Sequence, residues 1–241
     1  MAEKMKIDKD KIYAVLTGDI VGSTKFKGND RKYLHECLEA SSQKLVDSFS
    51  GSVPYPPEFF RGDSWQFLVT DSSKSLRIGT FFRALIKASS SSKHLDTRLS
   101  IGLGLLDFIP EENISSGDGE AFRLSGEGLE RLNKSNRMDI SFPVRFESNT
   151  AKAFEIILKL MDIKITEWTD KQANAVCGAL LDYTQETIAR HWFAKKISQQ
   201  AVAQHLDRAG WAKIASAIEF YETHLPMILR DEEQRENIHN N

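Results

Sequence analysis

The feature that most constrains this 241-residue chain is an apolar run near its start that ends on a carboxylate. Residues 12–16, with the sequence IYAVL, are typical of a buried strand that runs on to Asp19. A turn of small residues, Gly22, Ser23 and Thr24, follows. A strand that delivers an acid beside a turn with free backbone N–H groups is suited to hold a metal-bound phosphate.

A second carboxylate has a comparable place in the sequence. Asp63 belongs to residues 61–63 (RGD), a turn-forming segment between two strand-like runs at 52–60 and 64–70. Two acids from two strands of one sheet can share divalent cations, so the pattern predicts a metal site. The plainer interpretation is that Asp19 caps the next helix and that Gly-Asp is an ordinary turn dipeptide.

The order of elements predicts the fold of residues 1–148. Helical spacing marks residues 31–49, 76–86 and 120–132, and further strands are expected at 97–106 and 140–146. The succession is that of a ferredoxin-like βαββαβ domain of the α+β class. Gly102 and Gly104 lie on one face of their strand, where they leave room either for a ligand or for a closely packed helix.

The second half of the chain changes character and is predicted to be all-α. It comprises residues 149–230, followed by a charged tail at 231–241 that is expected to be disordered. Two short helices, at 183–189 and 197–206, have the caps and small contact residues of a helix-turn-helix. The side chains placed to meet duplex DNA are Lys195, Lys196, Ser198, Gln199, Gln200, Gln204 and Arg208. The segment between the helices is long and lacks glycine, so a protein-binding module is the alternative.

Composition indicates an ordinary soluble protein. The net charge is −2 and the pI is near 6.3, which excludes a strongly basic nucleic-acid-binding chain as a whole. Cys37 and Cys177 are far apart and lack the spacing of a zinc site, which favours a reducing cytoplasm. The start of the chain has no signal-peptide pattern, and no apolar run is long enough to cross a membrane.

Several short segments with small and charged residues are spread along both halves of the chain. They are GDIVGST at 18–24, Gly62-Asp63, IGLG at 101–104, GDGEAFRLSGEGLERL at 117–132, EWTDKQANAV at 167–176, TQETIA at 184–189 and ISQQAVAQHLDRAGW at 197–211. Together these segments resemble the SatD family of small bacterial proteins, and the resemblance covers residues 13–221.

The first half is also similar, more remotely, to the catalytic domains of class III nucleotidyl cyclases. That resemblance implies that Asp19 and Asp63 bind two Mg²⁺ or Mn²⁺ ions, with the Ile20 carbonyl as a further ligand. It also implies a nucleoside triphosphate as ligand. Its phosphates would lie against the backbone of Val21, Gly22, Ser23 and Thr24.

The chain departs from the cyclase pattern on the helix at 120–132. Arg123 stands where those enzymes have an asparagine, and Glu127 stands where they have the arginine that stabilises the transition state. Phe59 replaces the lysine that reads adenine. Arg61 and Arg123 are the residues left to take over a catalytic role.

Three hypotheses from different classes follow. The first is a regulator that binds a metal–nucleotide through its first half and DNA through its second. The second is a nucleotidyl cyclase or related phosphoryl-transfer enzyme, and the third is a non-catalytic interaction scaffold. The first two imply a homodimer, because cyclase sites lie at dimer interfaces and operator-binding proteins usually dimerise.

Overall fold

The structure is a computed structural model that describes residues 7–60, 62–89, 94–109, 114–192 and 196–239. Helices and strands alternate in the first half of the chain, and the second half contains helices. In chain order they are β1 (Tyr13–Ile20), α1 (Asn29–Phe49), β2 (Glu58–Phe60), β3 (Ser64–Val69), α2 (Ser75–Ala88), β4 (Thr97–Gly104), α3 (Glu120–Arg131), β5 (Met138–Ser141), α4 (Asn149–Thr166), α5 (Asp170–Leu180), α6 (Gln185–Arg190), α7 (Gln199–Ala209) and α8 (Trp211–His239). The mixed α+β class and the succession βαββαβ are confirmed.

The strands form one five-stranded sheet in the order β2-β3-β1-β4-β5. Strand β1 lies at the centre and runs antiparallel to both β3 and β4. Strand β5 runs parallel to β4 at one edge, and α3 provides the crossover that two parallel neighbours require. The central place of β1 agrees with its apolar sequence, which is buried from Tyr13 to Gly18.

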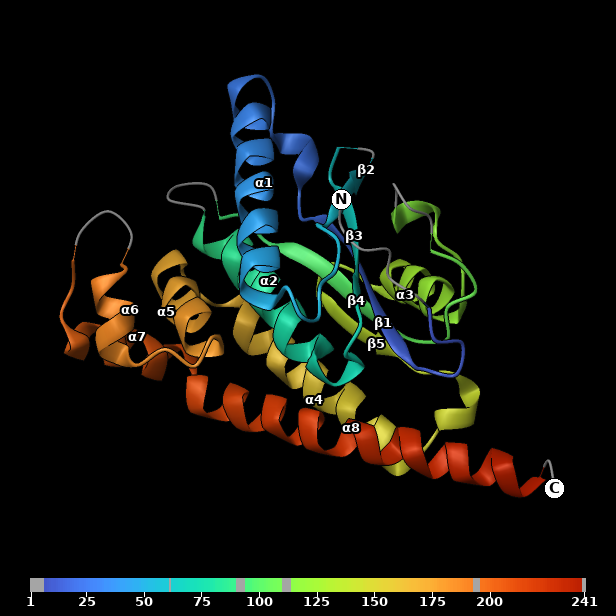
Figure 1. Ribbon diagram of the computed structural model, residues 1–241. Helices are drawn as coiled ribbons and strands as arrows, with labels where there is room; N and C mark the ends of the chain where they lie inside the picture. Colours follow the sequence, from blue (N-terminus) through green and yellow to red (C-terminus); the bar gives the residue numbers. More distant parts are fainter. Residues whose placement is uncertain (1–6, 61, 90–93, 110–113, 193–195, 240–241) are drawn as a thin grey trace.

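Helices cover both faces of the sheet (Figure 1). Helices α1 and α2 lie on one face, where the Phe82 ring meets Trp65 and Phe67 edge-on at centroid distances of 4.8 and 5.4 Å. Helix α3 lies on the opposite face, where Phe122 packs with Val15 in a separate apolar cluster. The two faces are therefore covered by different helices. The end of β1 that carries Asp19 lies near the end of α3, because Arg98 contacts both.

The glycines of β4 bring α3 unusually close to the sheet. A Cβ atom added at Gly102 would lie 2.3 Å from both the Ala121 carbonyl oxygen and the Ser125 nitrogen. The hydroxyls of Thr17 and Ser125 are 2.8 Å apart across this contact. The room left by the glycine is thus filled by a helix, as the second of the two sequence interpretations proposed.

The C-terminal helices pack against the sheet domain. Helices α5, α6 and α7 form a group at one end, while α8 runs along the lower side of the molecule in Figure 1, beneath α4. Its Tyr221 hydroxyl is 2.8 Å from the Ser75 hydroxyl at the start of α2, and its Glu222 pairs with Arg77 at 2.6 Å. One hydrophobic cluster reaches from Ile12 to Ile228, so the two predicted parts share a core.

A buried ion network also joins the two parts. Arg83 of α2 has no exposed side-chain surface and donates to Asp96 at 2.8 and 2.9 Å. It also donates to Asp162 of α4 at 2.6 Å. Lys87 and Arg137 lie against the same Asp96 carboxylate, at 3.4 and 2.5 Å. Since these charges are buried, each depends on the others for hydrogen bonds.

Three sequence predictions about element ends are wrong. The first run of the hairpin, expected at 52–60, is a strand only at Glu58–Phe60, since Pro54, Pro56 and Pro57 cannot donate ladder hydrogen bonds. The last strand lies at Met138–Ser141 rather than 140–146, because Pro143 cannot donate a ladder hydrogen bond and Val144–Phe146 form a 3-10 turn. Helix α8 continues to His239, through most of the expected tail at 231–241, whose Glu, Gln and Arg residues are good helix formers. The boundary near residue 148 stays a prediction.

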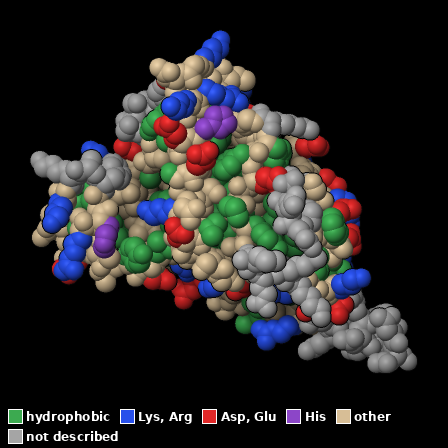
Figure 2. Space-filling view, turned by 45° about the horizontal axis from the view of Figure 1, so that its top comes forward, with side chains coloured by type: hydrophobic (Ala, Val, Ile, Leu, Met, Phe, Trp, Pro, Cys, Tyr) green, Lys and Arg blue, Asp and Glu red, His purple; other side chains and the backbone are tan. Residues whose placement is uncertain are grey.

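The surface carries both signs of charge. On the face shown in Figure 2, Lys and Arg side chains are interspersed with Asp and Glu, in line with the net charge of −2. Within the described ranges, no helix has both the length and the apolar character needed to span a bilayer.

Candidate functional site

The carboxylate at the end of β1 is held by an arginine. Asp19 lies opposite Arg98 in the β1–β4 pairing and opposite Ser64 in the β1–β3 pairing. Arg98 donates from Nε to Asp19 Oδ1 at 2.8 Å and makes a second, short contact from Nη2 to Oδ2. The pair is partly open to solvent, since the two side chains are 20% and 31% exposed. Asp19 is therefore a functional carboxylate only if Arg98 exchanges partners.

The second acid lies beside the first. The Asp63 carboxylate accepts a short hydrogen bond from the Ser23 hydroxyl, and its backbone carbonyl accepts from the Ile20 N–H at 3.0 Å. The hairpin turn is anchored from α1 by Arg31, which donates to the Gly62 carbonyl at 3.0 Å. The structure thus brings together the end of β1, the turn after it and the β2–β3 hairpin.

The turn at residues 21–24 is only partly available to a ligand. The Val21 N–H donates to the Asp96 carbonyl at 2.9 Å, and the Ser23 side chain is buried on Asp63. Gly22 has a positive φ of 69°, a left-handed conformation that favours glycine, and it is exposed together with Thr24. The exposed part of the predicted phosphate cradle is therefore Gly22 and Thr24.

Arg98 is the electrostatic centre of the site. Its hydrogen bond to Asp19 raises its pKa, against a smaller opposing effect of burial, and the charges of Asp19 and Asp63 raise it further. Its Nη1 donates to the Leu132 carbonyl at the end of α3, at 3.0 Å. One guanidinium thus joins Asp19 to the end of α3, and the charge of Asp63 acts on it without a hydrogen bond among the contacts described.

The oxygen atoms at this end of β1 are of the type that binds a hard cation. Carboxylate oxygens of Asp19 and Asp63 and the Ile20 carbonyl are the oxygen ligands that Mg²⁺ and Mn²⁺ prefer. Both Asp19 oxygens are engaged by Arg98, and the described residues hold no cluster of three or more His, Cys, Asp or Glu side chains suited to a metal. Magnesium, which often takes only one or two carboxylates plus phosphate oxygens, is the ion that such a set suits.

Of the two arginines expected to act in catalysis, the one that the structure describes, Arg123, lies away from the acids. Arg61 lies outside the described residues. Arg123 is exposed on the first turn of α3 and pairs with Asp118 at 3.0 Å and Asp107 at 3.6 Å, in the loop after β4. That loop follows Gly104, which is paired with Tyr13 at the start of β1. Six residues of strand, about 20 Å, separate this end from Asp19.

The short helices α6 and α7 are present and in contact, as predicted for a helix-turn-helix. Lys196, Gln199, Gln200, Gln204 and Arg208 are exposed, while Lys195 lies outside the described residues. Ser198 caps α7, because its hydroxyl accepts from the Ala201 N–H at 3.2 Å. Trp192, two residues after the end of α6, stacks on His205 of α7 at a centroid distance of 5.5 Å.

Sequence reasoning missed Arg98 and Arg31. In β4 the large apolar residues alternate with Arg98, Ser100 and Gly102, so the strand pattern alone places Arg98 on the polar face with Asp19. What the pattern cannot give is the register that sets the two opposite each other. For Arg31, on the first turn of α1, the sequence holds no comparable signal.

Comparison with known proteins finds remote likeness among solved structures only. No family model and no curated protein matches the chain. Among solved structures, the crystal structure of the guanylyl cyclase Cya2 is similar, with a TM-score of 0.40 and 14% sequence identity. The alignment covers 57% of this chain and 77% of that one.

Proposed function

We propose that this chain is a regulatory protein that binds a metal–nucleotide at the end of β1 and DNA through α7. The observation that supports it is that Asp19, paired with Arg98, and the turn that carries Asp63 lie at the same end of a ferredoxin-like βαββαβ sheet, where the Ile20 N–H donates to the Asp63 carbonyl. Two acids and one arginine are the groups needed to hold a phosphate together with a divalent cation. The SatD and cyclase resemblances point to the same end of the strand.

In this proposal Arg98 exchanges one anion for another. A phosphate accepts the same paired N–H donors that the Asp19 carboxylate accepts now, so the guanidinium moves from carboxylate to phosphate without losing hydrogen bonds. Asp19 and Asp63 are then available to Mg²⁺, which supplies charge neutralisation for the phosphates. Gly22 and Thr24 line the open side of the same turn.

Nucleotide binding should appear as a rise in the melting temperature of the full chain. ATP or GTP with Mg²⁺ at a hundredfold excess over Kd is expected to add about 2.7 kcal/mol, which is about 5–10 °C for a chain of this size. Arg98→Ala and Asp63→Asn are expected to abolish the shift, whereas Glu36→Gln, a change to an exposed acid on α1, should keep it. If no nucleoside triphosphate raises the melting temperature, the proposal of nucleotide binding is wrong and the scaffold hypothesis remains.

The cyclase alternative is tested in the same samples. Arg123 lies at the far end of β1 from the acids, so the structure offers less for transition-state stabilisation than for binding. Product from a nucleoside triphosphate with Mg²⁺ or Mn²⁺ that disappears in Asp19→Ala would make the protein a cyclase. A homodimer and a cytoplasmic location stay predictions.

The DNA half of the proposal predicts a salt-dependent affinity. Fluorescence anisotropy with a duplex should show binding that weakens steeply between 50 and 200 mM salt, by about 0.9 log units per phosphate contact for each tenfold change in salt. Lys196→Ala with Arg208→Ala is expected to reduce that slope by about 2, whereas Lys152→Ala on α4 leaves it unchanged. Binding that is indifferent to salt would contradict a phosphate-contacting α7.

A further inference from the structure

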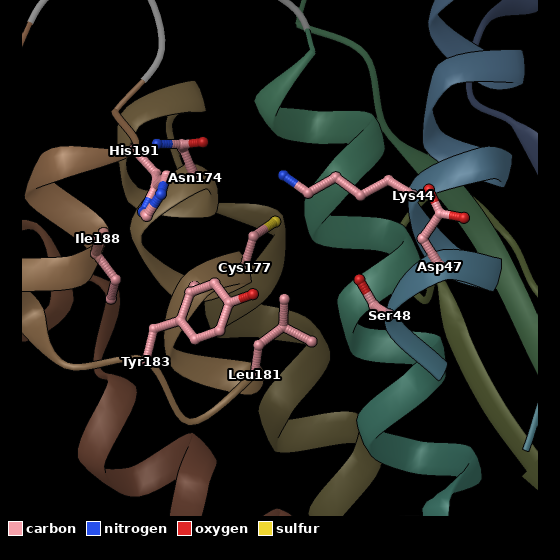
Figure 3. Close-up of a pocket in the computed structure, with 10 residues that line it drawn as sticks. Lys44, Asp47, Ser48, Asn174, Cys177, Leu181, Tyr183, Ile188 and His191 are labelled. Carbon is pink, nitrogen blue, oxygen red and sulfur yellow. The ribbon is translucent and has the colours of Figure 1, made fainter. Parts of the chain in front are cut away.

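A pocket of about 570 Å³ opens between α1 and the helices α5 and α6. Helices α1 and α5 both pack on α2 and leave a space between them, which Figure 3 shows in close-up. None of its lining residues belongs to the site at the end of β1. The volume is in the range of natural small-molecule sites, which is about 300–1,000 Å³.

Hydrogen-bond donors converge on one side of this pocket. In Figure 3 the Lys44 side chain reaches from α1 toward the α5–α6 side, where the Asn174 amide and the His191 ring lie. The His191 Nδ1 atom is 2.9 Å from the Thr187 carbonyl oxygen, which leaves Nε2 for a second partner. Asp47, the acid on the same wall, accepts from Gln43 along α1 at 2.8 Å. The open side of the pocket therefore presents hydrogen-bond donors, among them the cationic Lys44 and the Asn174 amide.

Apart from the Ser48 hydroxyl, the rest of the pocket is mainly apolar. Burial raises the pKa of the Cys177 thiol to about 12, so the floor is a neutral thiol rather than a nucleophile. Leu181 and the Tyr183 ring form the other end, and Tyr183 is 49% exposed. The turn that carries them is fixed: Asp182 has a left-handed φ of 57°, and Arg77 donates to the Leu180 carbonyl at 3.1 Å. A preformed aromatic wall is therefore present.

We infer that this pocket binds a small molecule with one anionic group and a planar apolar body. The anionic group pairs with Lys44 and receives a hydrogen bond from Asn174 or His191. The planar body lies against Tyr183 and Leu181, where it removes exposed aromatic surface from water. This site is independent of the proposed nucleotide and DNA sites, and a nucleoside triphosphate carries more charge than one lysine can match.

The probes are small aromatic compounds that differ in charge. Isothermal titration of the full chain with 1-naphthoate and with phenyl phosphate is expected to give Kd values of about 1 mM or tighter. The two anions separate a carboxylate ligand from a phosphate ligand. The neutral 1-naphthamide should bind at least about tenfold more weakly, since it keeps the planar body and loses the charge.

Two variants assign the binding to the pocket. Lys44→Met should weaken naphthoate binding at least about tenfold, and Tyr183→Ala should do the same, whereas Lys32→Met, a 79% exposed lysine on the same helix, should not. Lys44 and Tyr183 are exposed, so the variants should melt like the wild type. Absence of binding by both anions at 5 mM, equal binding of the amide, or indifference to Lys44→Met would each overturn the inference.

Discussion

Replacing Arg83 with methionine is expected to lower the free energy of unfolding by about 3–5 kcal/mol. The guanidinium is fully buried and holds Asp96, Asp162 and Thr166 at once. Methionine fills much of its volume but leaves two buried carboxylates with fewer donors, and an uncompensated buried charge is among the costliest single changes in a protein. The denaturant midpoint in guanidinium chloride, with an unchanged m-value, measures the loss.

A matched change at an exposed ion pair shows whether burial is the cause. Arg190 pairs with Glu186 on α6, and both side chains are about two-thirds exposed (68% and 64%). Arg190→Met is expected to cost less than about 1 kcal/mol, since exposed pairs contribute little. Similar losses in the two variants would mean that the Arg83 network is not a source of stability.

The same network should make the wild type sensitive to acid. Burial alone would raise the pKa of Asp96, but the charges and hydrogen bonds of Arg83, Lys87 and Arg137 outweigh it and bring the pKa to about 2. Because this lies below the value for an unfolded chain, the carboxylate contributes stability above pH 4 that is lost as pH falls toward 2, worth about 2 kcal/mol. Arg83→Met should flatten that part of the pH profile.

Gly102→Val is expected to destabilise the protein by about 3 kcal/mol or more, because its Cβ would meet backbone atoms of α3. The atoms at 2.3 Å belong to Ala121 and Ser125, so no flexible side chain can move aside. Displacing α3 also moves the Leu132 carbonyl that holds Arg98, so any nucleotide-induced shift in melting temperature should shrink as well.

Gly126 provides the control on the same helix. A Cβ there would meet nothing within 4 Å, so Gly126→Ala should stabilise the protein by about 0.5–1 kcal/mol through helix propensity alone. Opposite signs for the two glycine variants in urea denaturation are the expected result. A Gly102→Val protein as stable as the wild type would mean that α3 does not lie this close to β4.

How much of this could be predicted from the sequence depends on the range of the interactions. Local patterns were sufficient for β1, for the Gly62-Asp63 hairpin and for the succession βαββαβ, because apolar periodicity and turn residues act over a few positions. They also gave the two short helices α6 and α7. The end of β5 and the length of α8 were missed, since strand ends and helix continuation are decided by neighbours in space.

The site shows the same division. The neighbourhood of Asp19 and Asp63 follows from a hairpin next to the central strand, which the sequence suggests. The pairing of Asp19 with Arg98 requires the β1–β4 register, and the separation of Arg123 from the acids requires the direction in which α3 crosses the sheet. Neither is encoded in a local pattern, because both depend on contacts between residues far apart in the sequence, such as Asp19 with Arg98 (79 positions) and Thr17 with Ser125 (108 positions).

Helix α8 has a mechanical consequence. Only Gly210 separates it from α7, and Tyr221 and Glu222 fasten it to the start of α2. A tilt of α7 is therefore expected to move α8 and, through these two contacts, the start of α2, and the reverse holds too. Dividing the chain near residue 148 is therefore expected to expose an apolar face on each fragment, so that neither folds stably alone.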